Sequence, residues 1–103
     1  MKKVIDCKLY DTETADLIHS WNNGYYGSDF KRCEEDLYRT KKGTYFLHGS
    51  GGPMSAYAES CGNGMCGGEN IDVLTPDAAA QWLEQRDAVD ELQKYFPDYI
   101  EEG

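Results

Sequence analysis

Residues 35–48, EDLYRTKKGTYFLH, contain the strongest structural signal in the sequence. Two β-prone runs, 35–40 and 44–48, are joined by a short polar segment that ends at Gly43. Glycine adopts positive φ at little steric cost, as a tight turn between antiparallel strands requires. The stretch therefore predicts a β-hairpin, and the rest of the fold is expected to assemble around it.

Two elements are expected on the N-terminal side of this hairpin. Residues 3–10 alternate apolar and polar positions, the period typical of a strand with one buried face; its inward positions would be Ile5, Cys7 and Leu9. Residues 11–12 can cap a short amphipathic helix that ends at the polar run 22–24, and its apolar positions at helical spacing are Ala15, Ile18 and Trp21.

On the C-terminal side, the glycine-rich segment 49–68 is expected to be a long loop, because glycines stand at 49, 51, 52, 62, 64, 67 and 68. Residues 70–74 predict a short strand. Thr75 and Pro76 then form a strong helix start, a hydroxyl cap followed by proline at the first helical position.

The helix after Thr75 has the clearest amphipathic pattern in the chain. Its apolar stripe consists of Ala78, Trp82, Val89, Leu92 and Phe96. A break is expected near residue 87, and the proline at 97 should end the helix.

Together these elements predict a single α+β domain over residues 1–103. A small antiparallel sheet of three to four strands would pack against an N-terminal helix and a C-terminal helix or helix pair, with a long glycine-rich loop. The length and the 40% of hydrophobic residues are sufficient for one core without disulfides.

The charge of −9 is concentrated in the last third of the chain. Residues 1–68 carry nine acids and eight bases, whereas residues 69–103 carry ten acids and only Arg86 and Lys94 as bases. Binding to nucleic acid depends on Lys and Arg, so this charge disfavours nucleic acid and favours a basic partner. We expect a cytoplasmic protein with no membrane partner, because no apolar run is long enough for a membrane helix or a secretion signal.

The acids of the last helix form a stripe opposite Trp82, namely Glu84, Asp87, Glu91 and Asp98. Such a stripe is either a solvated face or a surface for a basic partner. Over about 21 Å of helix these carboxylates are far sparser than the phosphates of duplex DNA, which carries one charge per ~1.7 Å. A mimic of nucleic acid would therefore need further acids beside the stripe, for which the candidates are Asp29, Glu34, Glu35 and Asp36. The pair Tyr25 and Tyr26 is either an aromatic anchor for the partner or a lid on the core.

The cysteines suggest two alternatives to simple partner binding. Cys61 and Cys66, spaced C-x4-C in a glycine-rich segment, could bind zinc in a small adaptor if Cys7, Cys33 or His48 completed the ligands. Without a metal they are expected to be reduced thiols. An enzyme using Cys33 or Cys61 as nucleophile would need a base, and nothing in the spacing of the two histidines selects one, so no catalytic residue is expected.

The chain also resembles a family of proteins of about one hundred residues encoded on plasmids, prophages and conjugative elements of gut bacteria. The resemblance covers most of the chain through the segments VIDCKLYDTETADLI, WNNGYYGSDF, CEEDLYRTKKGTYFLHGSGGPMSAYAESCGN and VLTPDAAAQWLEQ. The family commonly has glycine where this chain has Cys7. Small acidic proteins on mobile DNA are similar to anti-CRISPR proteins, which implies a stoichiometric inhibitor of a CRISPR effector complex in the cytoplasm of the bacterial host.

Overall fold

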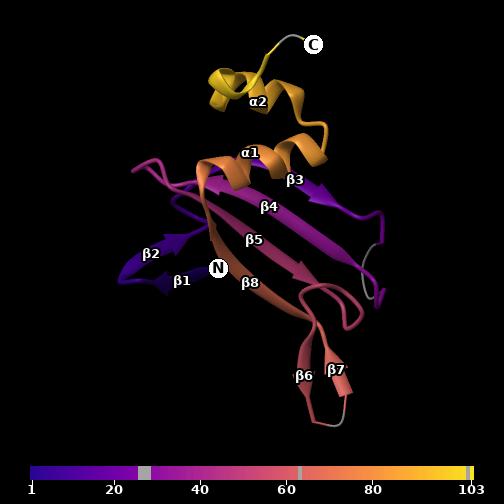
Figure 1. The fold of residues 1–103 in the computed structure, drawn as a ribbon. Coiled ribbons are helices and arrows are strands. Elements are labelled where there is room, and N and C mark those ends of the chain that lie inside the picture. Colours follow the sequence, from indigo (N-terminus) through magenta and orange to yellow (C-terminus); the bar gives the residue numbers. More distant parts are fainter. Residues whose placement is uncertain (26–28, 63, 102) are drawn as a thin grey trace.

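The computed structural model describes residues 1–25, 29–62, 64–101 and 103. Its centre is a four-stranded antiparallel sheet in the order β3-β4-β5-β8 (Figure 1). The strands are β3 (Asp16–Asn22), β4 (Cys33–Arg39), β5 (Tyr45–Gly51) and β8 (Gly68–Leu74). The hairpin predicted over 35–48 is confirmed as β4 and β5, and the strand predicted at 70–74 lies within β8.

Two helices follow the sheet, α1 (Pro76–Gln85) and α2 (Val89–Tyr95), and a 3-10 turn, η1 (Pro97–Tyr99), comes after them. The predicted cap is confirmed, since the Thr75 hydroxyl accepts the Ala78 N–H at 3.1 Å. The predicted break is confirmed too: Asp87 has φ +54 between the helices. The chain thus has an α+β fold. Among the described residues, no helix is long and apolar enough to cross a membrane.

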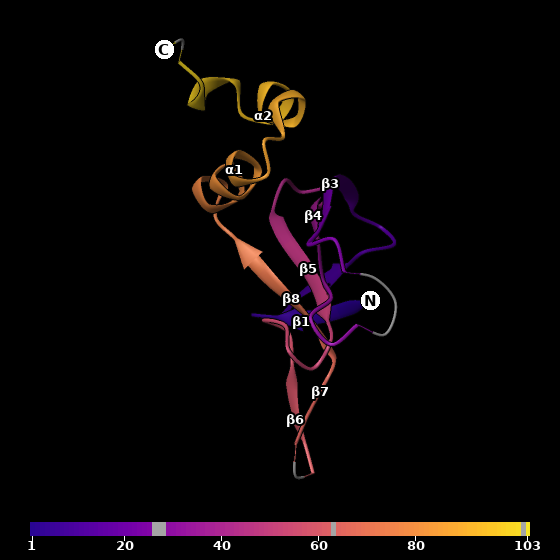
Figure 2. The same ribbon diagram turned by 90° about the vertical axis from the view of Figure 1, so that its right-hand side faces the viewer.

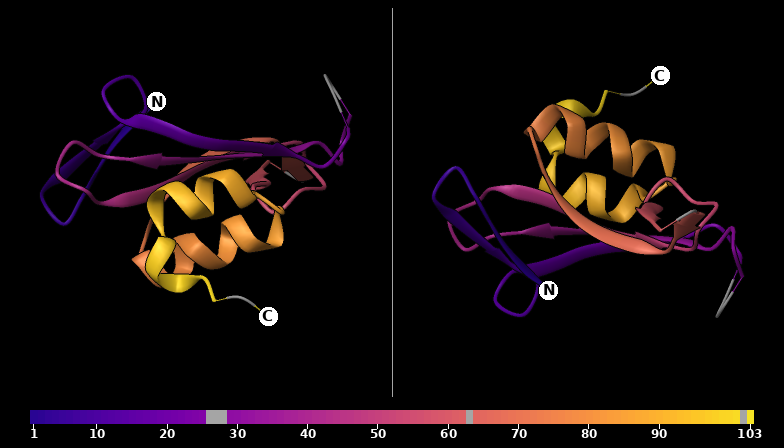
Figure 3. Two further views of the ribbon diagram at one scale, coloured as in Figure 1. Left: turned by 90° about the horizontal axis from the view of Figure 1, so that it is seen from above. Right: turned by 90° about the horizontal axis from the view of Figure 1, so that it is seen from below.

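The helices and the hairpin of β1 (Lys2–Ile5) and β2 (Lys8–Asp11) cover opposite faces of the sheet (Figures 2 and 3). Neighbouring residues of a strand point to opposite faces. Leu47 accordingly packs in the core beneath the helices, whereas Phe46 packs against Tyr10 of β2 in a second core. Both Leu37 and Phe46 are fully buried.

The predicted N-terminal helix is wrong, because its residues form β3. A bulge shifts the register between Leu17 and His19, so Ile18 and Trp21 both pack on the side of the helices although they are three residues apart. Ala15 instead packs with Tyr10 on the other side. A bulged strand thus reproduced the spacing of one helical turn.

The single strand predicted for residues 3–10 is also wrong, since the chain reverses at Asp6 and Cys7 to form the β1–β2 hairpin. Their φ values of 52° and 63° are those of a two-residue type I′ turn. The reversal changes which side chains share a face. Tyr10 and Ile5 face the core, while Leu9 is 59% exposed.

About half of the segment 49–68, predicted as a long loop, is strand, and residues 52–58 remain loop. Its first glycines belong to β5, and a further hairpin consists of β6 (Glu59–Cys61) and β7 (Gly64–Cys66). Figure 1 shows this hairpin projecting from the end of the sheet that is farther from the helices. Gly49 and Gly51 provide room for residues above the sheet, because an added Cβ would meet Tyr57 at 1.8 Å and Ser55 at 2.2 Å.

Candidate functional site

The outer surface of the layer formed by α1, α2 and η1, which we call the helical layer, is dominated by carboxylates. Its exposed acids are Asp77, Glu84, Asp87, Asp90, Asp98 and Glu101. Lys94 is the one exposed base in this layer among its described residues. Glu84, Asp87 and Asp98 of the predicted stripe are therefore free to meet a partner.

The fourth acid of that stripe, Glu91, is partly covered and points back to the sheet. Its Oε1 lies 3.5 Å from Nδ1 of His19 on β3. Val89, placed on the apolar stripe by the sequence, is instead 56% exposed. Both departures have one cause: the left-handed residue Asp87 reorients α2 relative to α1, so a single helical wheel does not describe the two helices.

Arg86, one of the two bases in the last third of the chain, is neutralised inside the fold. Its Nη2 donates to Oε1 of Glu35 on β4 at 2.8 Å, and the two side chains are only 19% and 14% exposed. The guanidinium also lies over the Trp21 ring, 3.9 Å from its centroid. Arg86 therefore offsets none of the negative charge that the helical layer presents outward.

Glu35 is the centre of this internal cluster and its carboxylate is fully engaged. It accepts hydrogen bonds from the Tyr57 hydroxyl at 2.5 Å and from Trp82 Nε1 at 3.0 Å, besides the bond from Arg86. Burial raises the pKa of Glu35, but the three donors outweigh it and leave the pKa below its ordinary value. The cluster joins the sheet, α1 and the loop that carries Tyr57.

Glu34 and Asp36, the strand neighbours of Glu35, point to the opposite face of the sheet. There they share a face with His48 and Ser50 of β5, as the strand register requires. Glu34 pairs with Arg32 at 3.5 Å, and His48 pairs with Glu69 of β8 at 2.9 Å. The structure therefore places the sheet acids and the helical acids on different faces and does not merge them into one surface.

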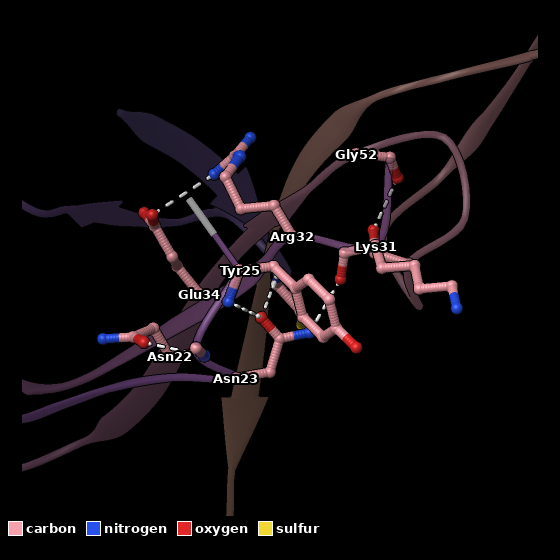
Figure 4. Close-up of polar contacts among 10 residues, drawn as sticks. Asn22, Asn23, Tyr25, Lys31, Arg32, Glu34 and Gly52 are labelled. Atoms are coloured by element: carbon pink, nitrogen blue, oxygen red, sulfur yellow. Dashed lines mark hydrogen bonds and ion pairs between the residues drawn. The ribbon is translucent and has the colours of Figure 1, made fainter. Parts of the chain in front are cut away.

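Asparagine side chains hold the two described ends of the segment between β3 and β4, residues 23–25 and 29–32 (Figure 4). Asn23 accepts the N–H groups of Cys33 and Tyr25 and donates to the Lys31 carbonyl at 2.7 Å. Tyr25 is 43% exposed and belongs to neither core cluster, and it lines a shallow hollow with Asp29 and Phe30. Tyr26, the other predicted anchor, lies outside the described residues.

A groove of about 560 Å³ runs between α1 and α2 on the outer side of the helical layer. Its apolar lining includes Val89, Leu92, Tyr99 and Ile100, and its acids are Asp77, Glu84 and Glu101. No Lys or Arg lines it among the described residues. The sequence placed Val89 and Leu92 on an apolar stripe expected to face the core, and it did not single out Tyr99 and Ile100, which follow the last helix.

The cysteines form no metal centre in the described part of the chain, where no group of three or more His, Cys, Asp or Glu side chains could hold an ion. Cys61 and Cys66 lie close on the β6–β7 hairpin, and a hydrogen bond with Cys61 raises the pKa of the Cys66 thiol. This pair alone does not supply the four ligands of a structural zinc site. Burial and the neighbouring Glu35 raise the pKa of Cys33, which keeps it protonated and opposes a nucleophilic role.

Comparisons with protein-family models, with curated proteins and with solved structures find no significant match to this chain.

Proposed function

We propose that this chain is a mobile-element-encoded, anti-CRISPR inhibitor that binds a CRISPR effector complex stoichiometrically in the cytoplasm of the bacterial host. The helical layer would occupy a basic surface of the effector and so block binding or cleavage of nucleic acid. The chain itself would bind no nucleic acid and catalyse no reaction. The family resemblance supports the class of target, and the distribution of charge supports the binding surface.

The observation that carries the proposal is the excess of exposed acids over exposed bases on the helical layer, where Lys94 is the one exposed base among the described residues. Arg86 is held inside by Glu35 and Trp21, so its charge does not screen the outward carboxylates such as Glu84 and Asp90. A surface that is predominantly of one sign attracts an oppositely charged partner and speeds association. The carboxylates are too sparse to replicate a duplex, so part of the affinity would come from neighbouring apolar contacts.

Two charge-reversed variants of equal net charge test this surface. One carries three lysines on the helical layer, in place of Glu84, Asp90 and Asp98. The other carries three lysines on the opposite sheet face, in place of Glu34, Asp36 and Glu69. Each changes the formal charge by the same amount, so a general loss of negative charge affects both alike.

The variants are compared by capture of effector complexes from a host lysate on the immobilised protein and by rescue of plasmid transformation against CRISPR interference. The helical variant should lose affinity for the captured effector by at least about tenfold, while the sheet variant keeps it. Inhibition that survives the helical reversal but not the sheet reversal would assign binding to the other face. Failure of the unaltered chain to protect plasmids in any CRISPR-bearing host would refute the inhibitor class.

A further inference from the structure

The groove of the helical layer combines an apolar floor with an acidic rim. One side is a stripe of α1 with members at Asp77, Ala80, Gln81 and Glu84, the spacing that places residues on one helical face. The other side comes from α2 and the segment after it. Here Val89, Tyr99 and Ile100 are 56%, 52% and 43% exposed, which is a cluster of apolar side chains that the fold itself leaves uncovered.

The acidic rim and the apolar floor adjoin each other. Asp77 and Tyr99 both line the groove, and the Asp77 carboxylate raises the pKa of the Tyr99 hydroxyl. Glu84 and Glu101 extend the negative charge along the same lining. An occupant has to be apolar where it meets Val89 and Ile100 and positively charged at its edges.

We propose that this groove binds a basic amphipathic helix of the partner protein. The proposal rests on the proposed function, because the helix would belong to the inhibited effector. Two adjacent helices leave a groove that accepts the side-chain ridges of a third helix. The ten residues of α1 extend over about 15 Å, so about three turns of a bound helix would fill the groove.

Charge argues against a second copy of this chain as the occupant. A copy would bring its own acids to a rim formed by Asp77, Glu84 and Glu101, and like charges that are desolvated together repel. A helix with Leu or Ile along one stripe and Lys or Arg on both sides matches the floor and the rim at once.

The probe is a fluorescein-labelled, capped peptide of about 14 residues with leucines at helical spacing and lysines elsewhere, matched to α1 in length. A second peptide has the same composition with the leucines scattered around the helix. Binding is measured by fluorescence anisotropy at moderate salt. We expect the scattered peptide to bind at least about tenfold more weakly, because it has the charge without the stripe.

Substitutions in the protein distinguish peptide binding in the groove from general electrostatic attraction of the peptide to the acidic protein. Val89→Ser should weaken binding of the striped peptide about fivefold to tenfold, whereas Val4→Ser on β1, also an exposed valine, should have no effect. Glu84→Lys should weaken binding more than Asp90→Lys, since both change the charge equally but only Glu84 lines the groove. Thermal unfolding of each variant confirms that it is folded.

Any one of three results would overturn the proposal that this groove binds a helix. These are equal binding of the two peptides, a Val89→Ser variant that binds like the parent, and equal effects of Glu84→Lys and Asp90→Lys. Sedimentation that shows a dimer dissociated by Val89→Ser would assign the groove to a second copy instead. The proposed function is judged separately by plasmid protection. If plasmid protection is lost in the triple-lysine helical variant but intact in Val89→Ser, the groove proposal is refuted and the proposed inhibitor function is retained.

Discussion

Glu35 and Glu34 are neighbours in sequence whose carboxylates enter different environments. Glu35 is 14% exposed and neutralises Arg86, whereas Glu34 is 46% exposed and pairs with Arg32 at 3.5 Å. Glu35→Gln leaves a buried guanidinium without its counter-charge and should lower the free energy of unfolding by about 3 kcal/mol. Glu34→Gln, the matched control, should cost less than about 1 kcal/mol. Urea unfolding measures both, and equal losses would show that Arg86 does not depend on Glu35.

The environment of Glu35 also predicts how the free energy of unfolding depends on pH. Hydrogen bonds hold the pKa of Glu35 below its ordinary value in the folded state despite burial, which opposes them. A carboxyl with a depressed pKa contributes stability above its unfolded pKa of about 4.3, and that stability is lost as the pH falls through the folded pKa. The difference in unfolding free energy between the parent and Glu35→Gln should therefore shrink as the pH is lowered from 7 towards 3. A difference that stays constant over this range contradicts the assignment.

Gly49 is a packing requirement of the Glu35 cluster. A Cβ at this position would overlap the Tyr57 ring, whose hydroxyl donates to Glu35. Gly49→Ala should displace Tyr57 and destabilise the fold by about 2 kcal/mol, and Gly64→Ala, where nothing lies within 4 Å, should not. In a Tyr57→Ala background the cost of Gly49→Ala should largely disappear. If it remains, the strain arises elsewhere in β5.

At the scale of elements, the sequence predicted those features whose cause is local. Gly43 marks the β4–β5 turn, with φ +91, and Thr75 with Pro76 marks the start of α1. β3 was missed because its bulge gave an edge strand the apolar spacing of a helix. The bulge arises from pairing with β4, which local sequence does not encode. The β1–β2 turn was missed because Asp6 and Cys7 lack the usual Asn-Gly or Gly signal for two positive φ values.

The β1–β2 turn predicts a stabilising substitution. Cys7 has φ +63, a conformation that costs residues with a Cβ about 1 kcal/mol. Cys7→Gly should raise the free energy of unfolding by about 0.5–1 kcal/mol, while Cys7→Ala keeps the strain and serves as the control. Thermal unfolding of the two variants under reducing conditions makes the comparison. A Cys7→Gly variant less stable than Cys7→Ala would show that the turn is not strained at this position.

At the scale of the whole molecule, the sequence showed that the last third of the chain is acidic, but it did not show which acids would lie together on one surface. Alternation along β4 sends Glu35 inward and Glu34 and Asp36 to the face away from the helices. Glu91 pairs with His19 and is partly removed from the outer surface of the helical layer. Arg86 pairs with Glu35 and is likewise removed from that surface. These outcomes depend on side chains distant in sequence, so composition could indicate a basic partner without indicating which face would meet it.

The arrangement of strands predicts where the molecule opens first. β4 and β5 are paired on both edges and covered on both faces around Leu37 and Phe46. β6 and β7 instead pair with each other in a separate two-stranded sheet, and their side chains are largely exposed. Amide exchange should therefore be slowest in β4 and β5, faster in β1–β2, and fastest in β6–β7. Hydrogen–deuterium exchange resolved by NMR checks this order. Protection of Ser60 and Met65 amides comparable to that of Leu37 would mean that the β6–β7 hairpin is held by more than its own ladder, and Gly64→Ala would then cease to be a neutral control.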